Sequence, residues 1–60
     1  RIQAVKVSED MLTFDLADGR SVSVPLAWYP TLLHASETER QTFEIQVWSV
    51  HWPLLDFDLA

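Results

Sequence analysis

The sequence predicts a small α+β domain, with a small antiparallel sheet and one or two short helices between its third and fourth strands. Within residues 11–16, Leu12, Phe14 and Leu16 alternate with Thr13 and Asp15, which is the period of two expected of a half-buried strand. Asp18-Gly19 follows and is typical of hairpin turns, because glycine accepts the positive φ that a type I′ turn requires. The segment 36–39 has the capping-box pattern that begins a helix.

A three-strand antiparallel meander is expected in the first half of the chain. Val5 and Val7 share one face of its first strand with Gln3, and Val22 is expected to point inward from its third strand. Pro25 cannot donate a ladder hydrogen bond, so it ends that strand. The expected strands span residues 2–7, 11–16 and 21–24.

Two short helical segments are expected after the meander. An irregular or short helix runs up to Tyr29, and a second piece begins at Pro30 and reaches His34 or Ala35, because proline is tolerated in the first turn of a helix. In the capping box, Ser36 accepts from the backbone N–H of Glu39, which predicts a further helix over residues 37–41.

Residues 42–50 are expected to form the fourth strand. Its first face carries Phe43, Ile45 and Val47, whereas Trp48 lies on the opposite face, which is polar at first and apolar later. The later part of that second face is therefore expected to be covered by the C-terminal segment or by another chain.

Composition indicates one domain over residues 1–60 that is rich in core material. The 60 residues are 48% hydrophobic and include three tryptophans but no cysteine, so the core depends on packing and not on disulfides or thiolate metal sites. The net charge is −5 and the four basic residues are scattered, which disfavours nucleic-acid and membrane partners and favours a basic protein. With no apolar run near the roughly 20 residues of a membrane span, we expect a cytoplasmic protein.

Three segments together resemble a known family. They read LADGRSVSVPL at residues 16–26, AWYPTLLHA at 27–35 and VHWPLLDFDL at 50–59. Their order and spacing are similar to the bacterial domain-of-unknown-function family 2442, from which this chain departs at Thr31, at residues 46–48 and at Phe57.

The resemblance implies a small α+β fold from bacteria or their phages, and little chemistry. Relatives often neighbour a second small protein, in pairs that look like toxin–antitoxin modules, and some carry an appended DNA-binding helix-turn-helix. The family usually continues into a short tail beyond the position of Ala60, so the domain is expected to be truncated at its C-terminus.

His51, Asp56 and Asp58 are the best candidates for a metal or acid–base site, because imidazole and carboxylates suit zinc and manganese. The spacing is not a recognised ligand pattern. Local packing of His51 on Trp52, with the aspartates capping a turn, is therefore the preferred interpretation. A pairing of His34 with a serine nucleophile lacks a nucleophile elbow. We expect no catalytic, cofactor-binding or metal-binding residue.

The aromatic side chains are divided between core and interface. Trp28 is expected in the core, and Arg40 is expected to pair with Glu37 or Glu44 on an exposed helix. Tryptophan is enriched at binding hot spots. The expected interface residues are Trp48, Phe57, Trp52 and Leu54.

These observations predict a protein–protein interaction module and no enzyme. Its partner is expected to be a second copy or another small bacterial protein, in the manner of an antitoxin. The alternative is a small metal-binding or enzymatic domain that uses His51, Asp56 and Asp58. A DNA-binding regulator is the third hypothesis, and the negative charge disfavours it.

Overall fold

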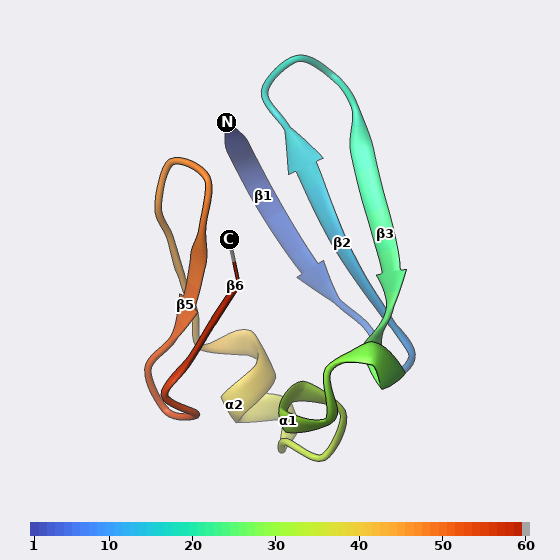
Figure 1. Ribbon diagram of the computed structural model, residues 1–60, viewed down its shortest axis with the longest axis vertical. Helices are drawn as coiled ribbons and strands as arrows, with labels where there is room; N and C mark the ends of the chain where they lie inside the picture. Colours follow the sequence, from blue (N-terminus) through green and yellow to red (C-terminus); the bar gives the residue numbers. More distant parts are fainter. Residues whose placement is uncertain (60) are drawn as a thin grey trace.

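The computed structural model describes residues 1–59, which form two three-stranded antiparallel sheets joined by short helical segments (Figure 1). The first sheet has the order β1-β2-β3 and the second β4-β5-β6, with the helices below both. The domain is therefore mostly β and only roughly α+β, because its helical segments are just three to five residues long. The elements are β1 (Ile2–Val7), β2 (Met11–Leu16), β3 (Ser21–Pro25), the 3₁₀ helix η1 (Leu26–Trp28), α1 (Pro30–Leu33), α2 (Glu37–Gln41), β4 (Glu44–Ile45), β5 (Val50–Trp52) and β6 (Phe57–Leu59).

The first sheet is the predicted meander, and its registers place the apolar side chains on one face. Val5 lies opposite Phe14, which in turn lies opposite Val22. The register shifts between residues 2 and 4 of β1, so Ile2 pairs with Leu16. Simple alternation placed Gln3 beside Val5, and this was wrong: Gln3 is exposed, since an irregularity of this kind interrupts the alternation of faces.

The hairpin between β2 and β3 is confirmed, but its turn type was predicted wrongly. Only Gly19 has a positive φ, of 94°, whereas a type I′ turn needs positive φ at Asp18 as well. The N–H of Gly19 donates to the carbonyl of Leu16 (3.1 Å), and the N–H of Leu16 donates to the carbonyl of Arg20 (2.7 Å). This is a type I turn followed by a glycine bulge, the common three-residue solution.

The helical segments follow the predicted order. Pro30 occupies the first turn of α1, which ends at Leu33, one or two residues earlier than predicted. The capping box of α2 is complete: the Ser36 hydroxyl accepts from the Glu39 N–H (3.1 Å), and the Glu39 carboxylate accepts from the Ser36 N–H (2.8 Å). None of the helices in residues 1–59 is long and apolar enough to cross a membrane.

The predicted fourth strand over residues 42–50 is wrong, because the chain reverses within it. Gln46 and Ser49 exchange backbone hydrogen bonds of 2.8 and 3.4 Å, so β4 and β5 become an antiparallel hairpin and form a second sheet with β6. The segment has no glycine or asparagine that would signal a turn. The turn is held from outside, because the N–H of Ile2 donates to the carbonyl of Val47 (3.0 Å).

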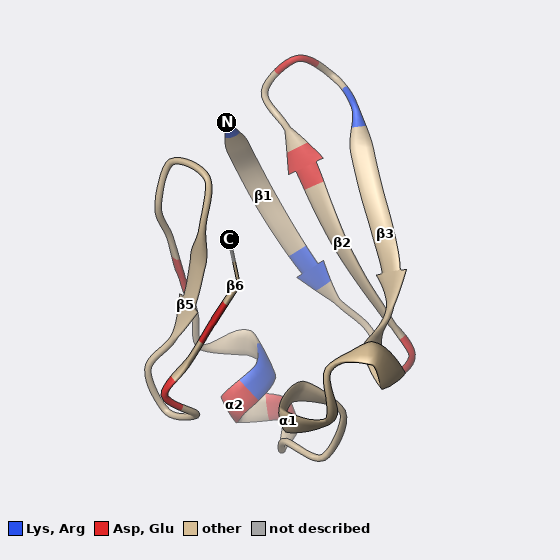
Figure 2. Ribbon diagram, viewed as in Figure 1, with Lys and Arg blue, Asp and Glu red and all other residues tan. Residues whose placement is uncertain are grey.

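The core lies where both sheets and the helices meet, with Trp52 at its centre. Trp52 is fully buried and stacks at a tilt against Phe43 and Phe57, with ring centroids 5.9 Å apart in each case. Charged residues lie at the turns, on α2 and at single positions on β1, β2 and β6, whereas β3 carries none (Figure 2). The buried residues are Val5, Leu12, Leu26, Leu32, Val50 and Trp52.

Candidate functional site

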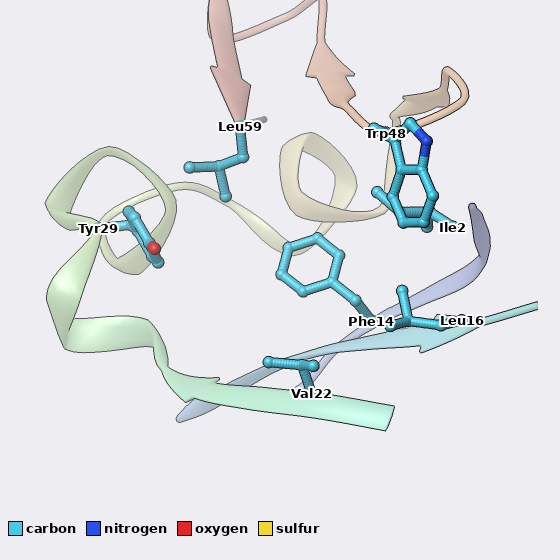
Figure 3. Close-up of a pocket in the computed structure, with 7 residues that line it drawn as sticks. All are labelled: Ile2, Phe14, Leu16, Val22, Tyr29, Trp48 and Leu59. Atoms are coloured by element: carbon cyan, nitrogen blue, oxygen red, sulfur yellow. The ribbon is translucent and has the colours of Figure 1, made fainter. Parts of the chain in front are cut away.

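An apolar groove lies between the inner face of the first sheet and the edge of the second (Figure 3). It encloses about 230 Å³. Phe14 stands near its middle in the view of Figure 3, with Trp48 and Tyr29 on opposite sides. The lining residues are Ile2, Phe14, Leu16, Val22, Tyr29, Trp48 and Leu59.

The floor of the groove follows from the strand geometry of the first sheet. Phe14 and Leu16 are two residues apart on β2, so they point to the same face. Val22 extends this face on β3 as the cross-strand partner of Phe14, and Ile2 extends it on β1 as the partner of Leu16. The register shift in β1 is what places Ile2 there.

The second wall depends on the reversal at residues 46–49. Trp48 belongs to the turn, and the hydrogen bond from Ile2 to Val47 holds this turn beside the first sheet. Leu59 comes from β6, opposite the buried Val50. Tyr29 closes one end and packs edge-to-face on Phe57, with ring centroids 6.3 Å apart.

The chemistry of the groove is hydrocarbon, with two polar groups. The Tyr29 hydroxyl and the Trp48 indole N–H are the hydrogen-bonding groups among the lining side chains. A volume of about 230 Å³ lies below the roughly 300–1,000 Å³ of a typical small-molecule site. An engineered cavity of about 150 Å³ holds one benzene ring. The groove therefore has the size for one aromatic or two small aliphatic side chains.

Trp48 is a predicted interface residue that the structure places on the groove, where 61% of its surface is exposed. Leu54 is also exposed, at 56%, in the turn between β5 and β6 and away from the groove lining. Phe57 is half-buried between Tyr29 and Trp52. Trp52 is fully buried, so its side chain belongs to the core of this chain.

The prediction that Trp28 lies in the core is wrong. Trp28 lies in η1 and is 66% exposed, because the 3₁₀ helix buries Leu26 and turns the side chain of Trp28 away. Pro30 begins a new helix directly afterwards, so the helical period expected across residues 26–33 is broken. Trp28 is thus a second large exposed aromatic side chain, outside the groove lining.

Arg40 stabilises the helical segment instead of forming the expected ion pair with Glu37 or Glu44. Its guanidinium donates to the carbonyl oxygens of Leu32 (2.9 Å) and Leu33 (2.5 Å) at the C-terminal end of α1. The planar guanidinium can satisfy two carbonyls that a helix end leaves without partners. This contact depends on how the chain turns between α1 and α2, so the spacing of residues along the sequence does not predict it.

The three residues considered as an alternative metal or acid–base site, His51, Asp56 and Asp58, are brought together only in part. His51 Nδ1 contacts the carboxylate of Asp58, its cross-strand partner on β6, while Glu44 is its partner on β4. Asp56 lies in the turn before β6 with a positive φ of 48°. Within residues 1–59, no group of three or more His, Cys, Asp or Glu side chains is placed to hold a metal ion. The His51–Asp58 contact is thus a neighbour pair within the second sheet.

Two aspartates, Asp15 on β2 and Asp18 in the turn between β2 and β3, have lowered pKa values. The Ser21 hydroxyl donates to Asp15 (2.7 Å) and Lys6 lies 3.3 Å away, and these contacts lower the pKa of Asp15. Hydrogen bonds from the side chain and backbone of Arg20 likewise lower the pKa of Asp18. Asp15 and Ser21 alternate with the groove residues Phe14 and Val22, so these contacts lie on the opposite face of the sheet.

Sequence reasoning missed most of the groove. It treated Phe14, Leu16 and Val22 as ordinary inward-facing positions of a sheet. Val22 remains 49% exposed, since the second sheet does not reach β3. The available signal was the surplus of apolar side chains, which indicated an uncovered surface without placing it.

Comparisons with known proteins agree with the resemblance. The model of the family described as "Protein of unknown function (DUF2442)" matches residues 2–60. No curated protein and no solved structure matches this chain. Because the match spans nearly the whole sequence, the chain belongs to the DUF2442 family.

Proposed function

We propose that this domain is a protein–protein interaction module that receives apolar side chains of another protein in the groove between its two sheets. The observation that carries the proposal is the open hydrocarbon groove with the exposed indole of Trp48 on one wall. A contiguous apolar surface of this kind costs solubility, and it marks interaction sites in soluble proteins.

The groove has the features of a hot spot. Trp48 contributes a large apolar side chain with one N–H donor, and tryptophan and tyrosine dominate the energetics of many interfaces. Tyr29 contributes a hydroxyl at the other end. An incoming aromatic or aliphatic side chain would therefore be covered on several sides and oriented by two polar groups.

The partner we propose is a small basic protein. The domain carries a net charge of −5, which accelerates encounter with a positively charged partner. A segment that presents one aromatic or two aliphatic anchors flanked by lysine or arginine meets both requirements. An antitoxin-like domain that binds a neighbouring small protein is the form of this proposal that the family resemblance suggests, and it needs no catalytic residue.

The test is selection of binders from a displayed random-peptide library on the immobilised domain, followed by calorimetry. We expect enriched peptides with an aromatic or aliphatic anchor beside basic residues. Trp48→Ala should weaken their binding at least tenfold, and Trp28→Ala is the matched control because it removes an equally exposed tryptophan outside the groove lining. Binding that depends on Trp28 and not on Trp48, or no enrichment at all, would overturn the proposal.

A further inference from the structure

The outer edge of β3 is an unpaired sheet edge. In the order β1-β2-β3, β2 covers one side of β3, and no described element lies along the other side (Figure 1). The opposite edge of this sheet is different, because β1 donates from Ile2 to the carbonyl of Val47 in the turn of the second sheet. The free edge of the first sheet is therefore at Ser21–Pro25.

The register identifies which backbone groups face outward. The bonds from Leu16 N–H to the Arg20 carbonyl and from Leu26 N–H to the Asp10 carbonyl flank the β2–β3 ladder. Hydrogen-bonded pairs alternate in an antiparallel ladder. Counting inward from these two bonds shows that the backbone groups of Val22 and Val24 bond to β2. The backbone groups of residues 21, 23 and 25 therefore point away from β2.

Pro25 fits this assignment, because its missing N–H would be on the outer side and interrupts no bond to β2. The outer edge thus offers the N–H and C=O of Ser21 and Ser23 and the C=O of Pro25. Natural edge strands are usually protected by lysine, inward charges or a central proline or bulge. Residues 21–25 contain no charged side chain, and the proline stands at the end.

We propose that a second copy of this chain pairs antiparallel with β3 and joins the two meanders into one six-stranded sheet. The strand is self-complementary about its middle residue, Ser23. Around a two-fold axis there, Ser23 and its symmetry mate exchange two hydrogen bonds, and on either side the Ser21 N–H donates to the Pro25 carbonyl of the other copy.

The side chains suit this pairing on both faces. Val22 of each copy lies opposite Val24 of the other, on the face that carries the groove, so the 49% exposed Val22 gains an apolar neighbour. On the other face Ser23 lies opposite Ser23, and both already belong to a polar row with Thr13, at 2.8 Å. Because residues 21–25 carry no charge, pairing two copies of β3 places no like charges opposite each other. Many other edges of a domain with a net charge of −5 would do so.

The interface is short, which sets the expected strength. Pairing of one five-residue strand lies at the low end of specific interfaces, so the dimer should dissociate on dilution. Each copy carries a charge of −5, so added salt should strengthen the association by screening the repulsion. The proposal concerns the backbone edge of β3, which adjoins the groove at Val22, and it does not rest on the proposed function.

The test compares two variants with the parent protein by light-scattering chromatography over a dilution series. Ser23→Pro removes an outward N–H without removing a bond to β2, and should shift the midpoint of dimerisation at least tenfold to higher concentration. Ser23→Ala is its matched control: it loses the same Thr13 contact but keeps the N–H, and should dimerise like the parent. Circular dichroism and melting confirm that both variants fold.

A single-cysteine crosslink tests the register, since the chain has no cysteine of its own. Ser23→Cys places two thiols at the axis, and mild oxidation should give a covalent dimer. Ser21→Cys lies on the same face but opposite Pro25, and should crosslink at least tenfold more slowly. A monomer at all concentrations, a dimer unaffected by Ser23→Pro, or equal crosslinking at both positions would overturn the proposal.

Discussion

The indole N–H of Trp52 donates a hydrogen bond to the backbone carbonyl of Arg40, at 3.0 Å. Trp52 belongs to β5 in the second sheet, and Arg40 belongs to α2. The same Arg40 holds the end of α1 through its guanidinium. One tryptophan and one arginine therefore connect the second sheet to both α-helices.

Replacing Trp52 should be the most damaging single change. Trp52→Ala is expected to lower the free energy of unfolding by about 3–5 kcal/mol, because it leaves a cavity among Phe43 and Phe57. Trp52→Phe keeps an aromatic ring in the core but leaves the Arg40 carbonyl without its hydrogen-bond donor. It should lower the free energy of unfolding by about 1–3 kcal/mol. Urea unfolding measures both. The exposed Trp28→Phe should stay within about 0.5 kcal/mol, and an equal loss there would contradict this assignment.

Arg40 should stabilise the fold through the two hydrogen bonds that its guanidinium donates, and not through its charge. Arg40→Lys keeps the charge but cannot reach both carbonyls in the same geometry, so we expect a loss of about 1–2 kcal/mol in unfolding free energy. Glu37→Gln removes a carboxylate that the sequence suggested as its partner, and should change stability by less than about 0.5 kcal/mol. A full rescue by lysine together with a loss in Glu37→Gln would restore the ion-pair interpretation.

Gly19 should resist substitution for conformational reasons alone. A Cβ at Gly19 would meet nothing within 4 Å, but the φ of 94° is one that other residues rarely adopt. Gly19→Ala is therefore expected to lower the unfolding free energy by about 1 kcal/mol or more. Gly19→Asn should cost less, because asparagine tolerates positive φ better than alanine does. Thermal melting of the pair is the measurement, and equal melting temperatures would argue against the bulged turn.

Acid should weaken the first sheet through Asp15, whose carboxylate contacts Lys6 on β1 and Ser21 on β3. The pKa of Asp15 in the folded chain is lowered from 3.8, first by the Ser21 hydroxyl and then by Lys6. Its stabilising contribution is therefore present above the unfolded pKa and is lost as the pH falls through the lower, folded pKa. Asp15→Asn should flatten the acid limb of a urea-midpoint profile between pH 2 and pH 6. If the mutant and the parent lose stability in parallel over that range, Asp15 does not carry this effect.

Local chemistry in the sequence determined the meander, the hairpin after Leu16 and the capped α2. Alternation on β2 needs only the geometry of a strand, a glycine permits the positive φ at residue 19, and the Ser36–Glu39 box closes within four residues. The family was also identifiable from the sequence, since its motifs are contiguous runs of residues.

The tertiary structure alone decided where the second half of the chain turns. The sequence of residues 42–50 predicts one strand, but the chain reverses at residues 46–49. The hydrogen bond from Ile2 to Val47 holds this turn, and burying Val50 and Trp52 stabilises the fold more than continuing the strand would. The same reversal moves Trp48 onto the groove. The exposure of Trp28 and the partners of Arg40 likewise depend on contacts between segments. Such contacts follow from packing in three dimensions, which the spacing of residues along a chain does not contain.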